Sequence, residues 1–433
     1  MTIHIVRQGD DLESIARTHR IPLWLLLMLN GLSGDETLVP GQSLLILYPQ
    51  IIHHVRAGDT LYKIARQHHI SLRTLYQNNP GLILKPYIYP GDPVVIAYKD
   101  APTDTITVNG YAYPFIPIPL FTETLPYLTG FNSFTYELTN DGRLALPPAD
   151  EMLIDMASLA GVLSYMVISN LREPDGFDPQ IAHDILSHPR LWPGLAGEIL
   201  SEVQKKGYAG VDVDFEYVMP KDRKAFPEFL AFLRSYLAPL KKSLSVALAA
   251  KNRADALEST VAGLDYQSIA QSVDYVLLMT YEWGYARGEP RAVAPLDEVE
   301  KVLDFAVTQI PSPKILLGIP NYGYDWPLPY IPGTTRATSI SNVEAVNLAR
   351  TYHSTIKFDE TAQAPWLTYT SQGTDHIVWF EDVRSIRAKL SLIHRYRLKG
   401  ACYWNLMRPF PPNWPLVSAL YKIRPDNSSS QGL

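Results

Sequence analysis

The sequence predicts an α/β protein in which two small βααβ modules precede a TIM (β/α)8 barrel with a small α+β insertion. Three observations predict it. A pattern of roughly 45 residues occurs twice at the N-terminus. After residue 104, apolar strand-like runs alternate with amphipathic helical patterns, which is typical of a parallel sheet covered by helices. Between about residues 324 and 381 extra strand signals interrupt that alternation, so this segment is expected to be an insertion.

The N-terminal repeat is visible in two stretches, IHIVRQGDDLESIARTHRIPLWLLLMLN from Ile3 and IHHVRAGDTLYKIARQHHISLRTLYQNN from Ile52. Each begins with a short strand-like run and a Gly-Asp turn, followed by apolar residues at helical spacing. A second short helix is expected to end near Asn30 or Asn79. A Pro-Gly pair then turns into a closing strand, SLLIL or PVVIA. The boundaries predicted from this pattern are 1–48 and 50–98.

The third predicted domain spans residues 104–425 and contains the barrel. An opening strand is expected near Tyr111 to Ile116, and helices are expected at Pro227 to Leu237 and Asp297 to Ile310. The other strand-like runs are FNSFTYEL, GVLSYMVIS, GVDVDFEYV, LSVALAAK, VDYVLLMTYEWG, KILLGIPNYGYDW and KGACYWNLM. Together they give about eight β-α units, the number in a TIM barrel. Residues 426–433 are expected to form a flexible tail.

Composition excludes several functional classes. The net charge of -6 over 433 residues provides no basic field for nucleic acid. The longest apolar run, Leu23 to Leu29, is far shorter than the ~20 residues of a membrane span. The N-terminus has no signal-peptide pattern, and the single cysteine, Cys402, excludes an internal disulfide. No metal-ligand spacing occurs among the 11 histidines, so no metal or other cofactor is expected, and the protein is expected to be a monomer.

The stretch GYAGVDVDFEYV places three carboxylates, Asp212, Asp214 and Glu216, on one face of a strand. An antiparallel strand with one solvent-exposed face shows the same alternation, so the pattern alone is also consistent with a strand at the protein surface. In a barrel the three side chains would point into the lumen, where bare carboxylates are costly unless they share protons and hydrogen bonds. Glu216 would then lie at the C-terminal mouth, and the two aspartates beneath it would raise its proton affinity, as a general acid requires.

Beside these residues, two resemblances stand out. The repeats resemble LysM modules through V-R-x-G-D-x-L, the Asn that closes the second helix, and the later P-G pair. The acidic strand resembles the D-x-x-D-x-D-x-E signature of family 18 glycoside hydrolases, the chitinase family. LLMTYEWG, GIPNYGYDW and YWNL are similar to that family's sixth, seventh and eighth strands. In combining both parts, the chain looks most like the spore cortex-lytic N-acetylglucosaminidases of endospore formers. One departure is Ala209, which stands where the family has its first Asp.

The resemblance implies a role for each matched residue. In the family the substrate's own acetamido oxygen attacks, and an oxazolinium ion forms with retention of configuration. Glu216 would be the acid and base, Asp214 would hold the acetamide N–H, and Asp212 would share the proton of Asp214. Tyr281 would hold the acetamide oxygen, and Trp404 would form the floor under the sugar. Further substrate contacts are expected from flanking or seventh-strand positions: Tyr217, Met279, Glu282, Asn321 and Tyr322.

The function implied is cleavage after N-acetylglucosamine in spore cortex peptidoglycan during germination. The expected binding partner is peptidoglycan, held by the LysM modules and the barrel cleft, and the expected location is the coat and cortex region of the spore. Two alternatives stay open. A chitinase or chitooligosaccharide hydrolase would act on plain N-acetylglucosamine polymer, and a non-catalytic glycan-binding protein would use the same cleft without turnover.

Overall fold

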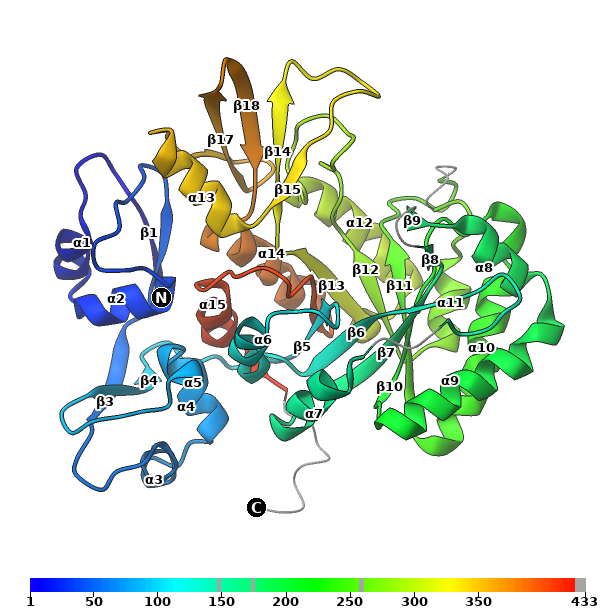
Figure 1. Ribbon diagram of the computed structural model, residues 1–433, viewed down its shortest axis with the longest axis horizontal. Helices are drawn as coiled ribbons and strands as arrows, with labels where there is room; N and C mark the ends of the chain where they lie inside the picture. Colours follow the sequence, from blue (N-terminus) through cyan, green and yellow to red (C-terminus); the bar gives the residue numbers. More distant parts are fainter. Residues whose placement is uncertain (146–148, 173–175, 257–260, 425–433) are drawn as a thin grey trace.

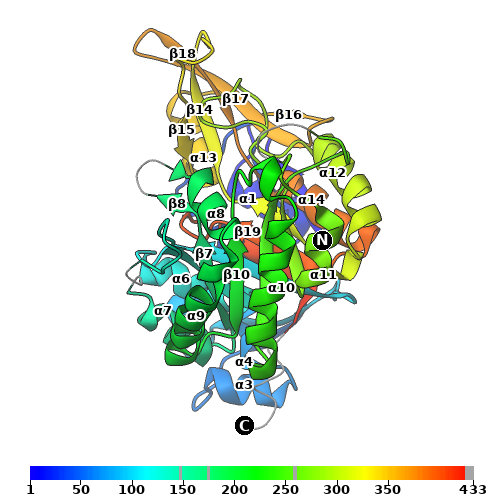
Figure 2. The same cartoon turned by 90° about the vertical axis from the view of Figure 1, so that its right-hand side faces the viewer.

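A computed structural model describes residues 1–145, 149–172, 176–256 and 261–424 (Figures 1 and 2). The predicted tail, 426–433, lies outside the described residues. Figure 1 shows the two N-terminal modules in blue on one side of the barrel and the insertion, with its long strands β14, β17 and β18, projecting from the barrel's upper edge. Within these ranges, none of the helices combines the length and apolar character needed to cross a bilayer.

The barrel is a closed ring of parallel strands, as predicted. Ring closure is direct, because the last strand pairs in parallel with the first, with Gly400 opposite Thr107. In ring order the strands are β5 (Thr105–Ala112), β6 (Gly130–Glu137), β7 (Leu163–Ser169), β10 (Gly210–Asp214), β11 (Ser243–Ala249), β12 (Tyr275–Met279), β13 (Ile315–Pro320) and β19 (Gly400–Trp404). A short strand, β20 (Lys422–Ile423), pairs with the start of β5.

Helices surround the ring because each presents one apolar stripe. In α10 (Ala225–Leu237) the buried residues Phe226, Phe229, Leu233 and Leu237 recur at helical spacing. The other helices of this layer are α6 (Ile118–Thr124), α7 (Glu151–Leu159), α8 (Pro179–Leu186), α9 (Trp192–Lys206), α11 (Tyr266–Ser272), α12 (Leu296–Gln309), α14 (Val383–Tyr396) and α15 (Asn413–Leu420). A small hairpin of β8 (Leu171–Arg172) and β9 (Gly176–Phe177) follows β7.

The prediction of the opening strand was wrong in position. The first barrel strand is Thr105–Ala112, and the segment near Tyr111 to Ile116 holds only its last two residues and the loop beyond. The physical reason lies in the prolines: Pro114 and Pro117 have no N–H for the ladder, whereas TITV is rich in β-branched residues.

The insertion is a five-stranded antiparallel sheet with one helix. The sheet order is β15-β14-β18-β17-β16, and α13 (Asn342–Thr351) packs on it. Its strands are β14 (Gly323–Leu328), β15 (Thr338–Ile340), β16 (Lys357–Asp359), β17 (Ala364–Ser371) and β18 (Thr374–Trp379). The small α+β insertion predicted between the seventh and eighth barrel strands is therefore present.

Each N-terminal module has antiparallel strands and the predicted order β-α-α-β, to which the second module adds a short helix, α5, before its last strand. In each module the repeated Asn connects the end of the second helix to the last strand. Asn30 donates to Leu45 O (2.9 Å) and accepts from Leu45 N (2.7 Å), and Asn79 makes the same pair of bonds with Val95. The first module contains β1 (Thr2–Ile5), α1 (Leu12–His19), α2 (Leu23–Asn30) and β2 (Ser43–Ile46). The second contains β3 (Pro49–His54), α3 (Leu61–Gln67), α4 (Leu72–Asn78), α5 (Gly81–Leu84) and β4 (Pro93–Tyr98).

Both modules dock on the catalytic domain. In the second module, Arg73 Nε donates to Pro126 O (2.9 Å), and its guanidinium also reaches Leu128 O. Gln77 Nε2 donates to Pro126 O (2.7 Å), and the backbone carbonyl of Gln77 accepts from the Tyr127 hydroxyl (3.1 Å). Burial in this contact lowers the pKa of Arg73 to about 10. The modules therefore have a fixed position relative to the barrel mouth.

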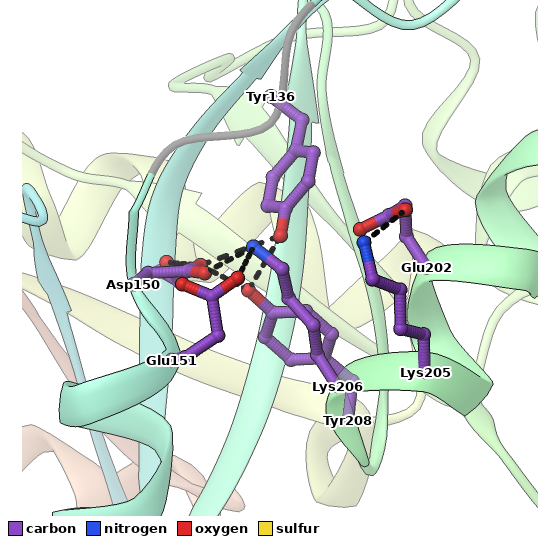
Figure 3. Close-up of polar contacts among 8 residues, drawn as sticks. Tyr136, Asp150, Glu151, Glu202, Lys205, Lys206 and Tyr208 are labelled. Atoms are coloured by element: carbon purple, nitrogen blue, oxygen red, sulfur yellow. Dashed lines mark hydrogen bonds and ion pairs between the residues drawn. The ribbon is translucent and has the colours of Figure 1, made fainter.

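A buried ion pair anchors the start of the acidic strand (Figure 3). Lys206, at the end of α9, lies 2.6 Å from Asp150 Oδ1, and both side chains are almost fully buried. The hydroxyl of Tyr208, just before β10, donates to Asp150 Oδ2, and the Tyr136 hydroxyl lies 3.0 Å from that of Tyr208. The cluster ties β6, α7, α9 and the approach to β10 together, below the catalytic mouth.

Replacing Lys206 by methionine is expected to destabilise the protein by about 3–5 kcal/mol, because it leaves the Asp150 carboxylate buried without its cation. The neighbouring Lys205→Met is the matched control. Lys205 lies 3.5 Å from Glu202 with 65% of its side chain exposed, and loss of such a pair costs roughly 0–1 kcal/mol. Thermal unfolding of both variants checks this expectation, and equal midpoints would contradict it.

Candidate active site

A cavity of about 860 Å³ opens at the C-terminal ends of the barrel strands. Such volumes are typical of ligand sites, and in TIM barrels this face carries the chemistry. Of the predicted residues, Asp214, Glu216, Tyr217, Met279, Tyr281, Glu282 and Trp404 line it. They come from β10, β12 and β19 and the loops that follow, so ring closure brings together residues almost 200 positions apart in the chain.

Asp212 lies one layer below the cavity, and both of its carboxylate oxygens accept hydrogen bonds. Tyr111 donates to its Oδ2 and Ser245 to its Oδ1. Burial raises the pKa of Asp212, and these hydrogen bonds oppose that rise. Ser245 comes from β11, which pairs with β10, whereas Tyr111 comes from β5, which is separated from β10 in the ring by β6 and β7. Their order in the sequence carries no local signal of this contact.

Asp214, the last residue of β10, is different. It is 4% exposed, and among the described residues its Oδ1 has no hydrogen-bond partner. Burial, with the charges of Glu216 and Asp212 next, raises the pKa of Asp214 well above its usual range. An unpartnered buried carboxylate oxygen is costly, and such groups persist where they serve a ligand or a reaction. Asp214 is thus prepared to accept a hydrogen bond from a molecule in the cavity.

Glu216 follows two residues after the strand ends, at the mouth. Asn170 holds its backbone from both sides: Glu216 N donates to Asn170 Oδ1 (2.9 Å), and Asn170 Nδ2 donates to Glu216 O (2.9 Å). Burial raises the pKa of Glu216 to about 7, with a further contribution from the charge of Glu282. Sequence reasoning missed Asn170, although its place directly after a barrel strand, SYMVIS, was an available signal.

The charge that acts on Glu216 therefore differs from the one expected. The sequence analysis assigned the rise in its proton affinity to Asp212 and Asp214, whereas Glu282, from the loop after β12, is the carboxylate that follows burial as a cause. Glu282 accepts hydrogen bonds from the hydroxyls of Tyr322 and Tyr324, the latter at 3.1 Å. These bonds fix a negative charge on the wall of the cavity.

Two cavity residues adopt a backbone conformation that is rare for side chains with a Cβ. Tyr217 has φ +56° and Glu282 has φ +67°. Left-handed backbone in residues other than glycine is strained, and such residues cluster at functional sites. Each directly follows a predicted catalytic residue, Glu216 or Tyr281. The strained turns aim these side chains at the cavity rather than along the strands.

Tyr281 needs a glycine beside it. A Cβ on Gly318 of β13 would lie 2.8 Å from the Tyr281 ring and 2.4 Å from Leu278 O. The glycine of GIPNYG therefore gives Tyr281 the space to lie against β13 and face the cavity. Trp404, at the end of the adjacent strand β19, also lines the cavity and packs edge-on against Phe134 (4.9 Å between ring centroids) and Tyr111 (5.6 Å).

Asn321 and Tyr322 do not line the cavity. Asn321 is buried, and its Nδ2 donates to Asn405 O and Arg408 O, both at 2.9 Å, so it braces the segment after Trp404. The Tyr322 hydroxyl donates to Glu282, which does line the cavity. Both lie one layer behind the residues that a ligand would touch, and their assignment as substrate contacts stays a prediction.

Ala209 lies at the opposite end of the strand from Glu216. Its backbone pairs on both sides, with Ser164 O (2.8 Å) and Ser243 N (3.1 Å). The missing carboxylate is therefore at the base of the row and leaves the Tyr111 and Ser245 contacts of Asp212 in place. Within the described ranges, no group of three or more His, Cys, Asp or Glu side chains has the arrangement of a metal site.

The arrangement fits acid–base chemistry on a bound glycan. Glu216, with a pKa near 7, is able to give a proton and to take it back near neutral pH. Asp214 supplies a fixed acceptor, and Trp404, Tyr217 and Tyr285 supply aromatic surface around it.

Comparison with known proteins agrees with this reading. The model of glycosyl hydrolases family 18 matches residues 194–408, and the LysM domain model matches residues 4–47 and 53–97. The cortical fragment-lytic enzyme of Bacillus subtilis (strain 168) is 35% identical over 98% of this chain and 99% of its own length. The crystal structure of the Bacillus cereus spore cortex-lytic enzyme SleL superposes with a TM-score of 0.83 at 32% identity, covering 98% of this chain and 99% of that one. A chitinase structure from Chromobacterium violaceum covers 72% of this chain at 26% identity, with a TM-score of 0.67.

The two LysM matches lie on the two modules that dock beside the barrel, and the family match includes Asp212, Asp214 and Glu216. The chain therefore belongs to glycosyl hydrolase family 18 and is a glycosidase with two N-terminal LysM domains, related over its whole length to spore cortex-lytic enzymes.

Proposed function

We propose that the protein cleaves the bond after N-acetylglucosamine in spore cortex peptidoglycan, with retention of configuration, during germination. In this proposal it acts in the coat and cortex region of the spore, and its LysM domains hold the same glycan. Support for the substrate comes from the full-length similarity to cortical fragment-lytic and spore cortex-lytic enzymes.

The observation that carries the mechanism is the unpartnered oxygen of Asp214 beside Glu216. In the proposed reaction the acetamido N–H of the sugar donates to Asp214, and the acetamido oxygen, held by Tyr281, attacks the anomeric carbon. Glu216 protonates the leaving oxygen as that bond breaks, so an oxazolinium ion forms. Glu216 then takes a proton from water, which opens the ion and restores the acetamide. Asp214 stabilises the positive charge that develops on the nitrogen.

This mechanism determines which glycosidic bond of the glycan is cleaved. The sugar on the non-reducing side of the cleaved bond must carry a free N-acetyl group. Muramic lactam, whose nitrogen is tied into a ring, has no such nucleophile, whereas N-acetylglucosamine has. The expected products of cortex glycan therefore carry N-acetylglucosamine at the new reducing end.

Incubation with purified cortex glycan and with chitin oligomers, followed by mass spectrometry and early proton NMR, tests the proposal. The expected first product is the β-anomer with N-acetylglucosamine at its reducing end. An initial α-anomer would indicate inversion, which needs a second carboxylate ~6.5–9.5 Å from the first. A muramic residue at the new reducing end would contradict the substrate, and faster cleavage of chitin than of cortex glycan would favour the chitinase alternative.

The pH profile gives a further prediction. Glu216 must be protonated to act as the acid, so hydrolysis is expected to fall as the pH rises above about 7. Glu282→Gln removes the neighbouring charge that raises the pKa of Glu216, and it keeps an oxygen for Tyr322 and Tyr324. In this variant, hydrolysis is therefore expected to begin to fall at a lower pH than in the parent enzyme. The matched control is Glu13→Gln, on the exposed side of α1, and an identical limb in both variants would contradict the assignment.

A further inference from the structure

Asn170, directly after β7, forms hydrogen bonds with two segments that follow it in the chain. Its Oδ1 accepts from Glu216 N (2.9 Å), and its Nδ2 donates to Glu216 O (2.9 Å) and to Asp178 O (3.0 Å). The backbone carbonyl of Asn170 accepts from Asp178 N (2.8 Å). The residue is fully buried. Asn170 therefore connects the end of β7 to the segment after β10 and to the start of α8.

The side chain of Asn170 continues the pairing of β7 with β10 beyond the last backbone pair. That pair is Ser169 with Asp214, where β10 ends. At Tyr217 the backbone is left-handed, with φ +56°, so the chain turns away from the ladder there. A side-chain amide offers the same donor and acceptor as a peptide group, so Asn170 bonds to both the N–H and the C=O of Glu216. The strand ladder thus fixes Asp214, whereas a side chain fixes the backbone of Glu216.

The start of α8 provides a rigid anchor for this arrangement. Asp178 is the N-cap residue of α8, and it follows Phe177, which lines the catalytic cavity. Helix α8 also holds the chain beyond Glu216, because His183 Nδ1 lies 2.9 Å from Oδ1 of the buried Asp222. The apolar side of this helix is buried. The segment from Glu216 to Asp222 is therefore held at both ends against a packed helix.

The proposed reaction requires Asp214 and Glu216 to act on two parts of one substrate at the same time. Asp214 must meet the acetamido group while the Glu216 carboxyl meets the glycosidic oxygen. A misplacement of ~1 Å in such a site can lower the rate by about 10²-fold. We propose that Asn170 is a positioning residue, which sets the place of the Glu216 carboxyl relative to Asp214. This inference rests on the proposed function, in which Glu216 is the acid.

The nature of the leaving group distinguishes a misplaced acid from a general loss of structure. A sugar hydroxyl is a very weak acid, so its oxygen needs a proton as the bond breaks. A phenol such as methylumbelliferone is a much stronger acid, and it departs with little help from Glu216. Loss of folded protein lowers kcat/KM for both kinds of substrate by the same factor. A misplaced Glu216 carboxyl lowers it mainly for the sugar leaving group.

Steady-state kinetics of the full chain with two substrates tests the proposal. One substrate is a soluble fragment of cortex glycan, and the other is the methylumbelliferyl glycoside of di-N-acetylchitobiose. Both are measured below a pH of about 7, where Glu216, with a pKa of about 7, is protonated. In Asn170→Ala, kcat/KM is expected to fall by about 10²-fold for the cortex fragment and far less for the aryl glycoside.

Two further variants control for folding. Asn170→Asp has nearly the same size and keeps the acceptor for Glu216 N, but it loses the donor to Glu216 O and Asp178 O. It should therefore change kcat/KM in the same direction as Asn170→Ala, with a smaller effect. Asn413→Ala removes another buried asparagine of the barrel domain, at the start of α15, whose Oδ1 accepts from the Tyr403 hydroxyl (3.0 Å). This matched control should keep the parent enzyme's ratio of the two kcat/KM values.

A fall of the same size for both substrates in Asn170→Ala, or no fall for either, would overturn the proposal. Glu216→Gln, measured in the same way, separates this result from a failure of the proposed function. It should also lose far more activity on the cortex fragment than on the aryl glycoside. An equal loss on both substrates in Glu216→Gln would instead overturn the assignment of Glu216 as the acid, and with it the role of Asn170.

Discussion

Glu216→Gln is expected to lower turnover of cortex glycan by about 10²–10⁴-fold, because an amide has no proton to donate to the leaving oxygen. The glutamine keeps the size of the side chain and the backbone bonds with Asn170, which involve only the main chain of residue 216. Single-turnover and steady-state rates on the same glycan measure the loss. Cleavage within a few-fold of the parent enzyme would show that the acid is another residue.

Stability gives the control for this variant. The pKa of Glu216 is raised to about 7 in the folded protein, from an ordinary value near 4.5. A raised carboxyl pKa means that the charged form is disfavoured in the folded state, so the penalty appears as the pH rises above the unfolded value and is complete above about 7. Glu216→Gln should therefore unfold at a higher temperature than the parent at pH 8 and at the same temperature near pH 4. Lost activity together with a lowered midpoint at both pH values would instead indicate misfolding.

Asp214→Asn is expected to reduce turnover by about 10²–10³-fold, the usual effect of removing one preorganised electrostatic contact in the transition state. The asparagine occupies the same space but carries no charge to stabilise the positive nitrogen of the proposed oxazolinium ion. Binding of a thiazoline analogue of N-acetylglucosamine is expected to weaken in parallel, since mimics of high-energy intermediates bind far more tightly than substrates.

Asp212→Asn is the comparison for Asp214→Asn. Asp212 is held by Tyr111 and Ser245 and does not line the cavity, so the thiazoline should keep more of its affinity in this variant than in Asp214→Asn. Unchanged thiazoline affinity in Asp214→Asn would remove Asp214 from the proposed mechanism. A larger loss from Asp212→Asn would place the essential charge one layer lower.

The sequence by itself determined the elements whose signal is local. Period-two alternation predicted Asp212, Asp214 and Glu216 on one face of a strand, and in the structure this strand ends at Asp214, two residues before Glu216. Helical spacing predicted α10 and α12 to within two residues. Repetition identified both LysM domains, and the repeated Asn30 and Asn79 proved to close each domain through paired backbone bonds. Each of these signals depends on residues close together in the chain.

The tertiary structure decided which groups meet across the ring and between domains. Tyr111 reaches Asp212 across 101 positions, and Glu282 acts on Glu216 from the loop after β12. The docking of the LysM domains on the barrel domain likewise has no pattern in the sequence. The physical reason is that periodicity records only which face of an element is apolar. Charge interactions and unpaired hydrogen-bonding groups depend on the distances that barrel closure and domain packing set.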